Sequence, residues 1–312
     1  MINLAGRMLY PGLVNAHDHL ELNHFPRSKF RPVYDNAQQW SLDFQPRLDE
    51  EPYYSLRQEP LDQRCRVGGL KNLISGVTTV AQHNPLHKPL RRRDFPVRVV
   101  QRYGWAHSLY LEPDVTGSYR RTASSQPWMI HLAEGTDTAS AQELSQLSAL
   151  GCLQANTVLI HGVGLSAEDR RQTIDAGAGL VWCPSSNFYL LGKTAEVGEF
   201  ARAHRLALGT DSRLTADGDM LDEIKAAFAT GQLAPEQLFY AVTTDAANLL
   251  RLKRTGALLP GYLPDFFIAA PTNEPDPYQR LMTLRHDEIE TVYIGGVVRY
   301  ESGAKKKFSN AR

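Results

Sequence analysis

Short apolar segments recur along the chain, and each ends at a polar residue or a turn. Most of them are followed by a stretch with the periodicity of an α-helix. Strands that alternate with helices in this way predict parallel strands joined through crossover helices. The clearest predicted strands are residues 13–16, 77–81, 128–132, 158–161, 180–183 and 206–209.

Capping residues and periodicity predict the helices between these strands. Ser166 and Asp169 stand three residues apart and are typical of a capping box that opens a helix ending near Gly177. Pro235 suits the first turn of another helix. The remaining predicted helices are residues 139–150, 220–230 and 235–250.

The two ends of the chain do not follow this alternation of strands and helices. Residues 255–270 and 290–300 have strand-like patterns separated by turns rich in Pro and Gly. We therefore predict an α/β fold in three parts. These are a (β/α)8 TIM-type barrel over residues 12–254, a small truncated β-sandwich element from residues 1–11 and 255–302, and a flexible tail over residues 303–312.

The barrel is expected to be short between its second and fifth strands. Residues 82–129 hold one plausible strand pair, 97–103 and 106–111, where a complete barrel needs two strands with their helices. Residues 27–66 lack a clear period, but aromatic residues such as Trp40 favour ordered packing over disorder.

Composition and charge narrow the class of protein. A chain of 312 residues with 42% hydrophobic and 22% charged residues is ordinary for a globular domain. The 34 basic and 34 acidic residues give no net charge, which argues against nonspecific electrostatic binding to nucleic acid or to an anionic membrane. No apolar run approaches the roughly 18 residues that span a bilayer, and the start of the chain does not look like a secretory signal.

The three cysteines are widely separated and form no disulfide framework. We therefore expect a cytoplasmic protein that acts on a small molecule, without nucleic acid or membrane as a partner. A homodimer is left open.

Polar side chains stand at the ends of four predicted strands. His17 and His19 follow residues 13–16 and are two residues apart, so in an extended chain both point to the same side. Barrel enzymes place their catalytic side chains at such C-terminal strand ends. The other polar residues at strand ends are His131 with Glu134, His161 and Asp211.

The spacing of these residues fits a repeating βα unit. His161 follows His131 by 30 residues, about one unit, and Asp211 follows His161 by 50 residues, about two units. Three imidazoles and a carboxylate suit one divalent ion, Zn²⁺ first, with iron or manganese as alternatives. Such an ion lowers the pKa of a bound water toward about 7 and so supplies hydroxide at neutral pH. A nearby carboxylate must then move protons, and Glu134 is the obvious candidate.

Taken together, the motifs resemble the amidohydrolase superfamily. The matching pieces, in the family's order, are PGLVNAHDHL (11–20), SGVTTV (75–80), HLAE (131–134), HG (161–162), CPSSNFYL (183–190) and GTDS (209–212). The set is most similar to the branch with one metal ion, which includes cytosine and guanine deaminases and triazine hydrolases.

The resemblance implies a site as well as a fold. It implies catalytic roles for Glu134, His161 and Asp211, and the metal ligands His17, His19, His131 and Asp211. Members with two metals carry a carboxylated lysine on the fourth strand, but residues 89–130 contain no lysine, which favours one metal. We also predict that substrate contacts come from His83, His107, Asn187 and Ser212.

The leading hypothesis is a hydrolase that deaminates an amino-substituted heterocycle by means of metal-bound hydroxide. One alternative is the same chemistry on a cyclic amide, an imidazolone or another C–N or C–Cl bond. The other is a non-catalytic binding protein that retains the fold, which the short middle region would allow.

Overall fold

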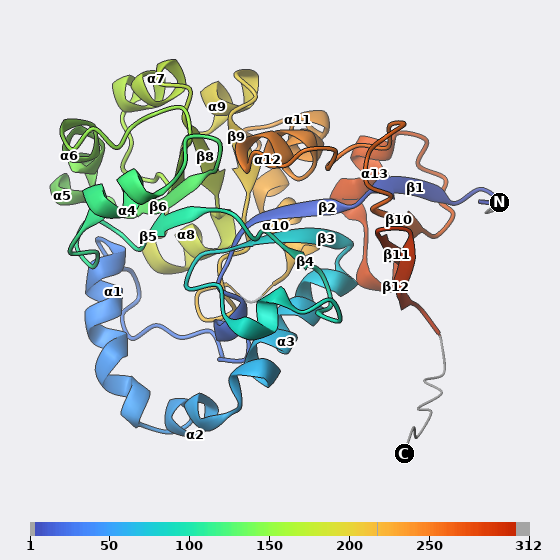
Figure 1. Ribbon diagram of the computed structural model, residues 1–312, viewed down its shortest axis with the longest axis horizontal. Coiled ribbons are helices and arrows are strands. Elements are labelled where there is room, and N and C mark those ends of the chain that lie inside the picture. The colour runs from blue at the N-terminus through green and yellow to red at the C-terminus, as the bar shows by residue number, and fades with distance from the viewer. Residues whose placement is uncertain (1–3, 217, 304–312) are drawn as a thin grey trace.

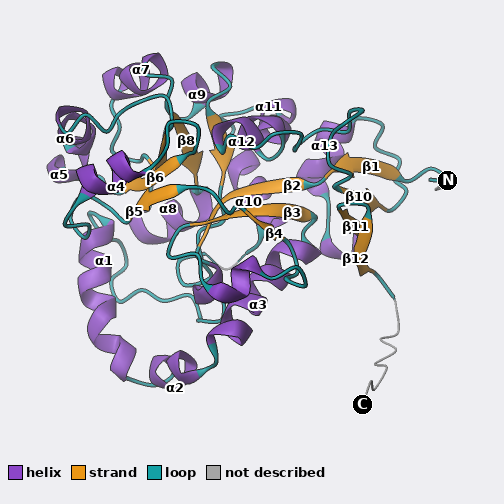
Figure 2. Cartoon of the chain, viewed as in Figure 1, coloured by secondary structure: helices purple, strands orange, loops and turns teal. Residues whose placement is uncertain are grey.

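The parallel strands form two sheets in the computed structural model, which describes residues 4–216 and 218–303 (Figures 1 and 2). The first sheet has the order β2-β3-β4 and the second the order β5-β6-β7-β8-β9, with every pair parallel. The strands are β2 (Leu13–Asp18), β3 (Val77–Gln82), β4 (Arg98–Val99), β5 (Gly104–Ala106), β6 (Trp128–Leu132), β7 (Thr157–His161), β8 (Gly179–Trp182) and β9 (Leu206–Leu208). All six strands predicted from the apolar runs are therefore present.

The two parallel sheets approach each other where β9 ends beside β2. The backbone N–H of Asp211 donates to the carbonyl oxygen of His17 at 3.2 Å. The N–H of Thr210 donates to the side-chain oxygen of Asn15, also at 3.2 Å. The first and last parallel strands are thus neighbours, and their C-terminal ends lie together.

The two sheets are also connected through the short segment that holds β4 and β5. β4 pairs with β3 and β5 pairs with β6, yet only residues 100–103 join them, and the described residues of this connection include no helix. The expected shortening is therefore located here. The predicted strand 97–103 was too long, since β4 covers only residues 98–99. The predicted strand 106–111 was misplaced, since β5 covers residues 104–106 and residues 107–111 form a loop and turn.

Helices alternate with the strands along most of the chain. The capping box predicted for Ser166 and Asp169 is present. The predicted helix 235–250 is instead two helices, because the hydroxyl of Thr243 bonds back to the Phe239 carbonyl at 2.6 Å and the backbone breaks there. Residues 139–150 are likewise divided. The helices outside the segment 20–60 are α3 (Leu61–Ile74), α4 (Val115–Arg121), α5 (Thr138–Ala141), α6 (Glu143–Ala149), α7 (Ala167–Asp175), α8 (Pro184–Leu191), α9 (Gly198–Arg202), α10 (Met220–Ala229), α11 (Pro235–Ala241), α12 (Thr244–Leu249) and α13 (Pro277–Thr283), with the 3-10 turns η3 (Lys88–Arg91) and η4 (His286–Glu288).

Residues 20–60, called the cover segment below, leave the end of β2 and reach across to later loops. Three backbone bonds of 2.9 Å fasten it: Ser28 N–H to Leu214 O, Tyr34 N–H to Leu190 O, and Ala37 N–H to Glu134 O. The segment is therefore ordered, as its aromatic residues indicated. It contains η1 (Leu20–Leu22), α1 (Ala37–Phe44), η2 (Gln45–Asp49) and α2 (Tyr53–Gln58), and α1 and α2 lie at the lower left of Figure 1.

Both ends of the described chain meet in one antiparallel sheet of order β1-β10-β11-β12, to the right in Figure 1. Its strands are β1 (Met8–Pro11), β10 (Phe266–Ala269), β11 (Ile289–Ile294) and β12 (Val297–Glu301). Gly295 and Gly296, both with positive φ, form the β11–β12 turn as a tight hairpin requires.

The predicted β element is thus a single sheet in the described part of the chain, and nothing supports a sandwich. Residues 255–265 are turns and not strand. Of the predicted tail, residues 304–312 lie outside the described residues.

The parallel strands are buried on both faces, as expected when helices cover them. Small and branched side chains of β2, β3, β6, β7 and β8 form one buried cluster, while a larger cluster packs between strands and helices. This packing fixes the strand ends, from which the histidines and the aspartate described next project.

Candidate active site

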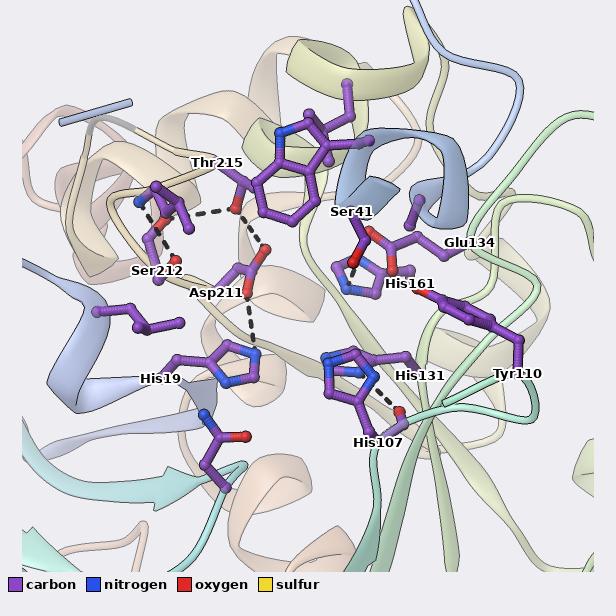
Figure 3. A pocket seen from close by; sticks show the side chains of 16 residues that line it. His19, Ser41, His107, Tyr110, His131, Glu134, His161, Asp211, Ser212 and Thr215 are labelled. Carbon is purple, nitrogen blue, oxygen red and sulfur yellow. Dashed lines mark hydrogen bonds and ion pairs between the residues drawn. The ribbon is translucent and has the colours of Figure 1, made fainter. Parts of the chain in front are cut away.

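Three histidines and one aspartate meet at the C-terminal ends of the parallel strands. The Nε2 atoms of His17 and His19 each lie 3.4 Å from Oδ1 of Asp211. Nε2 of His131, from β6, lies 3.3 Å from Nε2 of His17. All four residues are buried. The residues predicted as metal ligands are therefore brought together, and Figure 3 shows three of them, His19, His131 and Asp211.

The backbone is strained where three of the strands end. Ala133, His161 and Asp211 have φ angles of 52°, 74° and 51°, in the left-handed region that residues other than glycine rarely adopt. Such strain is concentrated at functional sites, because the surrounding structure must hold it in place. It turns the side chains of His161 and Asp211 into the common space.

The charge balance of this cluster calls for a cation. Burial lowers the pKa of His17 to about 3, and burial also holds the pKa of His131 well below its usual value, so both rings are neutral at pH 7. Burial alone would raise the pKa of Asp211, but the neighbouring rings of His17 and His19, whose Nε2 atoms both lie 3.4 Å from Oδ1, hold it well below its usual value.

The neutral rings of His17 and His131 give the buried Asp211 carboxylate no counter-charge, and buried charges are normally paired or bind metal. The residues present therefore fit a divalent ion. Nitrogen and carboxylate donors of this kind are the usual ligands of zinc.

Glu134 and His161 face each other beside this cluster. Nε2 of His161 lies 3.5 Å from Oε1 of Glu134. Burial, together with the nearby carboxylates of Asp211 and Glu143, holds the pKa of Glu134 well above its usual value. Glu134 therefore keeps its proton to higher pH than a free glutamate does, which favours a role as general acid.

The ring of His161 is oriented from behind by Asn187. Nδ1 of His161 lies 2.9 Å from the side-chain oxygen of Asn187, whose amide nitrogen donates to Thr194 Oγ1 at 3.2 Å. This arrangement places the amide oxygen against His161, so Nδ1 carries the proton and Nε2 of the neutral ring presents its lone pair toward Glu134.

The carboxylate of Asp211 is held on its other oxygen. Oδ2 accepts a hydrogen bond of 2.8 Å from Ser186 Oγ and one of 2.6 Å from Thr215 Oγ1. Oδ1 therefore stays directed at the histidines. Thr215 was not predicted, because it lies in an irregular loop four residues after Asp211, where no pattern marks it.

A cavity of about 110 Å³ opens beside these groups. Two of the predicted substrate contacts, His107 and Ser212, line it, whereas His83 and Asn187 lie behind the cluster and each contact a ring nitrogen of a site histidine. Among the residues that the structure describes, no lysine or arginine lines this cavity. Its walls are formed by His19, Leu22, Ala37, Trp40, Ser41, Asn84, His107, Tyr110, His131, Glu134, His161, Leu190, Asp211, Ser212, Leu214 and Thr215.

The cover segment supplies a wall of this cavity that was not predicted. Trp40 stacks on Phe44 with ring centroids 5.3 Å apart, and its indole N–H donates to the carbonyl oxygen of Ser28 at 2.9 Å. The N–H is therefore occupied, and the indole meets the cavity as an apolar surface. Ser41, one residue further along α1, adds a hydroxyl to the same wall.

A buried polar network supports the strand ends from behind. Asp18, between His17 and His19 in the sequence, lies 3.1 Å from the ammonium group of Lys71 on α3. Asp18 also accepts hydrogen bonds of 2.7 Å from the amides of Asn23 and Asn72. Lys71 in turn donates to the hydroxyl of Thr210 at 3.0 Å. The network joins the backbone of His17 and His19 to the residue that precedes Asp211.

Residues 125–299, more than half of the chain, match the model of the amidohydrolase family. The chain belongs to the amidohydrolase family. The amidohydrolase family and the structural similarity to a triazine hydrolase imply that the parallel strands belong to a TIM-type barrel.

Curated relatives are named deaminases. The 8-oxoguanine deaminase of Pseudomonas aeruginosa is 28% identical over 195 residues, which cover 56% of this chain and 43% of that protein. The 5-methylthioadenosine/S-adenosylhomocysteine deaminase of Pyrococcus abyssi is 27% identical over 193 residues, covering 54% of this chain and 45% of that protein. The similarity thus spans less than half of either relative.

Solved structures share the fold over almost the whole chain. Atrazine chlorohydrolase from Arthrobacter aurescens, in complex with zinc, aligns with a TM-score of 0.77 at 16% identity, covering 96% of this chain and 86% of that one. An adenosine deaminase from Xanthomonas campestris with bound zinc aligns with a TM-score of 0.74 at 18% identity, covering 94% of this chain and 80% of that one. At these identities the likeness establishes the fold.

No helix in the described part of the chain is long and apolar enough to cross a membrane.

Proposed function

We propose that the chain is a metal-dependent hydrolase that deaminates a neutral, amino-substituted heterocycle. The observation that carries the proposal is that Glu134, whose pKa is raised, and Asp211, whose pKa is lowered, line one cavity. A proton donor and a proton acceptor are the two groups that hydrolysis of a C–N bond requires. The relatives named as deaminases support the choice of bond.

One divalent ion completes the proposed site, with zinc favoured over iron or manganese by the donor set. When bound, such an ion supplies an activated water near neutral pH. The residues that would hold it are His17, His19, His131 and Asp211.

The remaining groups would handle protons. Asp211 would accept a proton from the attacking water, because Ser186 and Thr215 occupy Oδ2 and keep Oδ1 directed into the site. Glu134 would give its proton to the nitrogen of the substrate, and ammonia would leave. His161 would hold Glu134 and the substrate in place, since its Nε2 faces the carboxyl group.

The lining of the cavity supports a neutral, planar substrate. Trp40 and Tyr110 contribute aromatic rings, and Ser41 and Asn84 contribute hydrogen-bonding groups. A phosphate group would find no lysine or arginine among the described lining residues and would meet the carboxylates instead. We therefore expect a free base or a nucleoside to be accepted and a nucleotide to be refused.

Three wider proposals accompany this one. The strands β2 to β9 would form a closed barrel over residues 12–254, with residues 1–11 and 255–302 as a β appendage, which the contact of β9 with β2 supports. The site would hold a single metal. A cytoplasmic location is supported by three cysteines that are all free and buried.

Release of ammonia tests the proposed function. The zinc-loaded protein would be incubated with 8-oxoguanine, 5′-methylthioadenosine, cytosine and an aminotriazine, and with the 5′-phosphate of adenosine as the charged comparison. Ammonia from at least one neutral compound and none from the nucleotide is expected. Chloride without ammonia from a chlorotriazine would favour the alternative C–Cl hydrolase, and a protein that binds no divalent ion would favour a non-catalytic role.

A further inference from the structure

His83 lies directly behind the metal-ligand histidines, between one of them and the backbone. It follows β3 and is fully buried. Its Nε2 atom lies 3.0 Å from the carbonyl oxygen of Ala106, and its Nδ1 atom lies 3.3 Å from Nδ1 of His17. The His83 ring also stacks on His131, with the ring centroids 4.2 Å apart. His83 therefore joins the end of β5 to a ligand on β2.

These contacts determine where the protons lie. A carbonyl oxygen only accepts hydrogen bonds, so Nε2 of His83 must carry a hydrogen. A neutral imidazole has one N–H, which leaves Nδ1 of His83 as an acceptor. His83 is fully buried, and no carboxylate among the described residues hydrogen-bonds to it, so the neutral ring is favoured. Nδ1 of His17 must then donate, and Nε2 of His17 is left with a free lone pair.

The same logic applies to His131. Its Nδ1 atom lies 2.8 Å from the carbonyl oxygen of His107, so this nitrogen also carries a hydrogen and Nε2 carries the lone pair. The two Nε2 atoms of His17 and His131 then face each other at 3.3 Å with no hydrogen between them. Two lone pairs at that distance repel each other, and a cation held by both removes the repulsion.

We propose that His83 is a positioning residue for the metal centre, which keeps the proton of His17 on Nδ1 so that Nε2 is free to bind a divalent ion. The inference rests on the proposed metal site. It also gives a role to the end of β5, because the consecutive carbonyl groups of Ala106 and His107 orient one ring each. Such hydrogen bonds behind a ligand commonly set its tautomer and its basicity.

Nitrogen-15 NMR of histidine-labelled protein tests the proton positions without any substitution. In the metal-free protein, long-range ring correlations are expected to show His17 protonated on Nδ1 and His83 protonated on Nε2. After one equivalent of zinc, the Nε2 signal of His17 should shift as a ligand while its Nδ1 keeps the hydrogen. A His17 ring protonated on Nε2 in the metal-free protein would overturn the inference.

Substitutions separate the hydrogen bond from the packing. His83→Phe keeps a stacked ring but offers no acceptor, so zinc affinity measured against a competing chelator should fall by about 10- to 100-fold. In His83→Asn the side-chain oxygen stands where Nδ1 of His83 stood, and most of the affinity should return. His24→Phe is the matched control for zinc affinity, because the ring of His24 hydrogen-bonds to the carbonyl oxygen of Leu56 and not to a ligand.

The outcomes distinguish this inference from the proposed function. Wild-type affinity in His83→Phe contradicts the positioning role alone. Absence of zinc binding by the wild-type protein contradicts the metal site itself, and with it the proposed function. Should His83→Phe fail to fold, as thermal unfolding of the metal-free protein would show, the NMR result on the wild-type chain decides the question.

Discussion

Lys71→Met would remove the cation from the buried network behind the site. The ammonium group lies 3.1 Å from Asp18, which is fully buried, and 3.0 Å from the hydroxyl of Thr210. Removing one partner of a buried ion pair typically costs about 3–5 kcal/mol, because the other charge stays buried without compensation. Asp18 keeps the two amide donors of Asn23 and Asn72. We therefore expect the lower end of that range, about 3 kcal/mol.

A double-mutant cycle measures this interaction. Urea unfolding of the metal-free protein would be followed for Lys71→Met, Asp18→Asn and the double variant. Each single change leaves a buried polar partner, whereas the double change removes both charges. The double variant should therefore be more stable than the sum of the two single losses predicts, with a coupling energy of about 2 kcal/mol or more. Additive losses, or a loss below about 0.5 kcal/mol for Lys71→Met, would refute the reasoning.

Three further predictions concern charge, substrate and metal. Burial raises the pKa of Glu223 to about 7, so this carboxyl group binds its proton more tightly in the folded state than in the unfolded state. The stability that the bound proton contributes is present below about pH 4.5 and is lost as the pH rises to about 7. Glu223→Gln should remove up to about 3 kcal/mol of that pH dependence. A wild-type free energy of unfolding that changes between pH 5 and pH 8 no more than that of Glu223→Gln would contradict the assignment. Trp40→Ala should raise KM about 2- to 10-fold, since an aromatic contact contributes about 0.5–1.5 kcal/mol. Leu42→Ala, on the same helix but 63% exposed, is its control. The same KM in Trp40→Ala and in the wild type would exclude Trp40 from substrate binding. Addition of zinc at 100 times its Kd should stabilise the fold by about 2.7 kcal/mol, and an unchanged melting temperature would count against the metal site.

The strand ends could be predicted from the sequence because their signal is local. His17 and His19 follow an apolar run and are two residues apart, and this pattern alone places both side chains on one side of an extended chain. His131, His161 and Asp211 each end another run. Their convergence then follows from parallel strands, whose C-terminal ends lie at the same edge.

Other features depend on contacts between distant segments and leave no local pattern. Trp40 and Ser41 reach the cavity only because backbone hydrogen bonds fasten the cover segment at three places. These are the loop after β6, the end of α8 and the loop after β9. His83 was expected beside the substrate, yet its position behind His17 is decided by the Ala106 carbonyl on a strand of three residues. That strand is too short to be recognised from periodicity, and the boundaries around it were wrong for the same reason.

Comparing wild-type protein with Glu134→Gln tests the central claim most directly, through zinc content and ammonia release measured on the same samples. The substitution keeps the shape of the side chain but removes its acidic proton. Glu168→Gln is the matched control, since that carboxylate is exposed on α7 with a side-chain exposure of 79%. The account predicts one zinc ion per chain in all three proteins, ammonia release by the wild type and by Glu168→Gln, and a loss of at least about 100-fold in Glu134→Gln. Turnover by Glu134→Gln at the wild-type rate, with zinc bound, would contradict it.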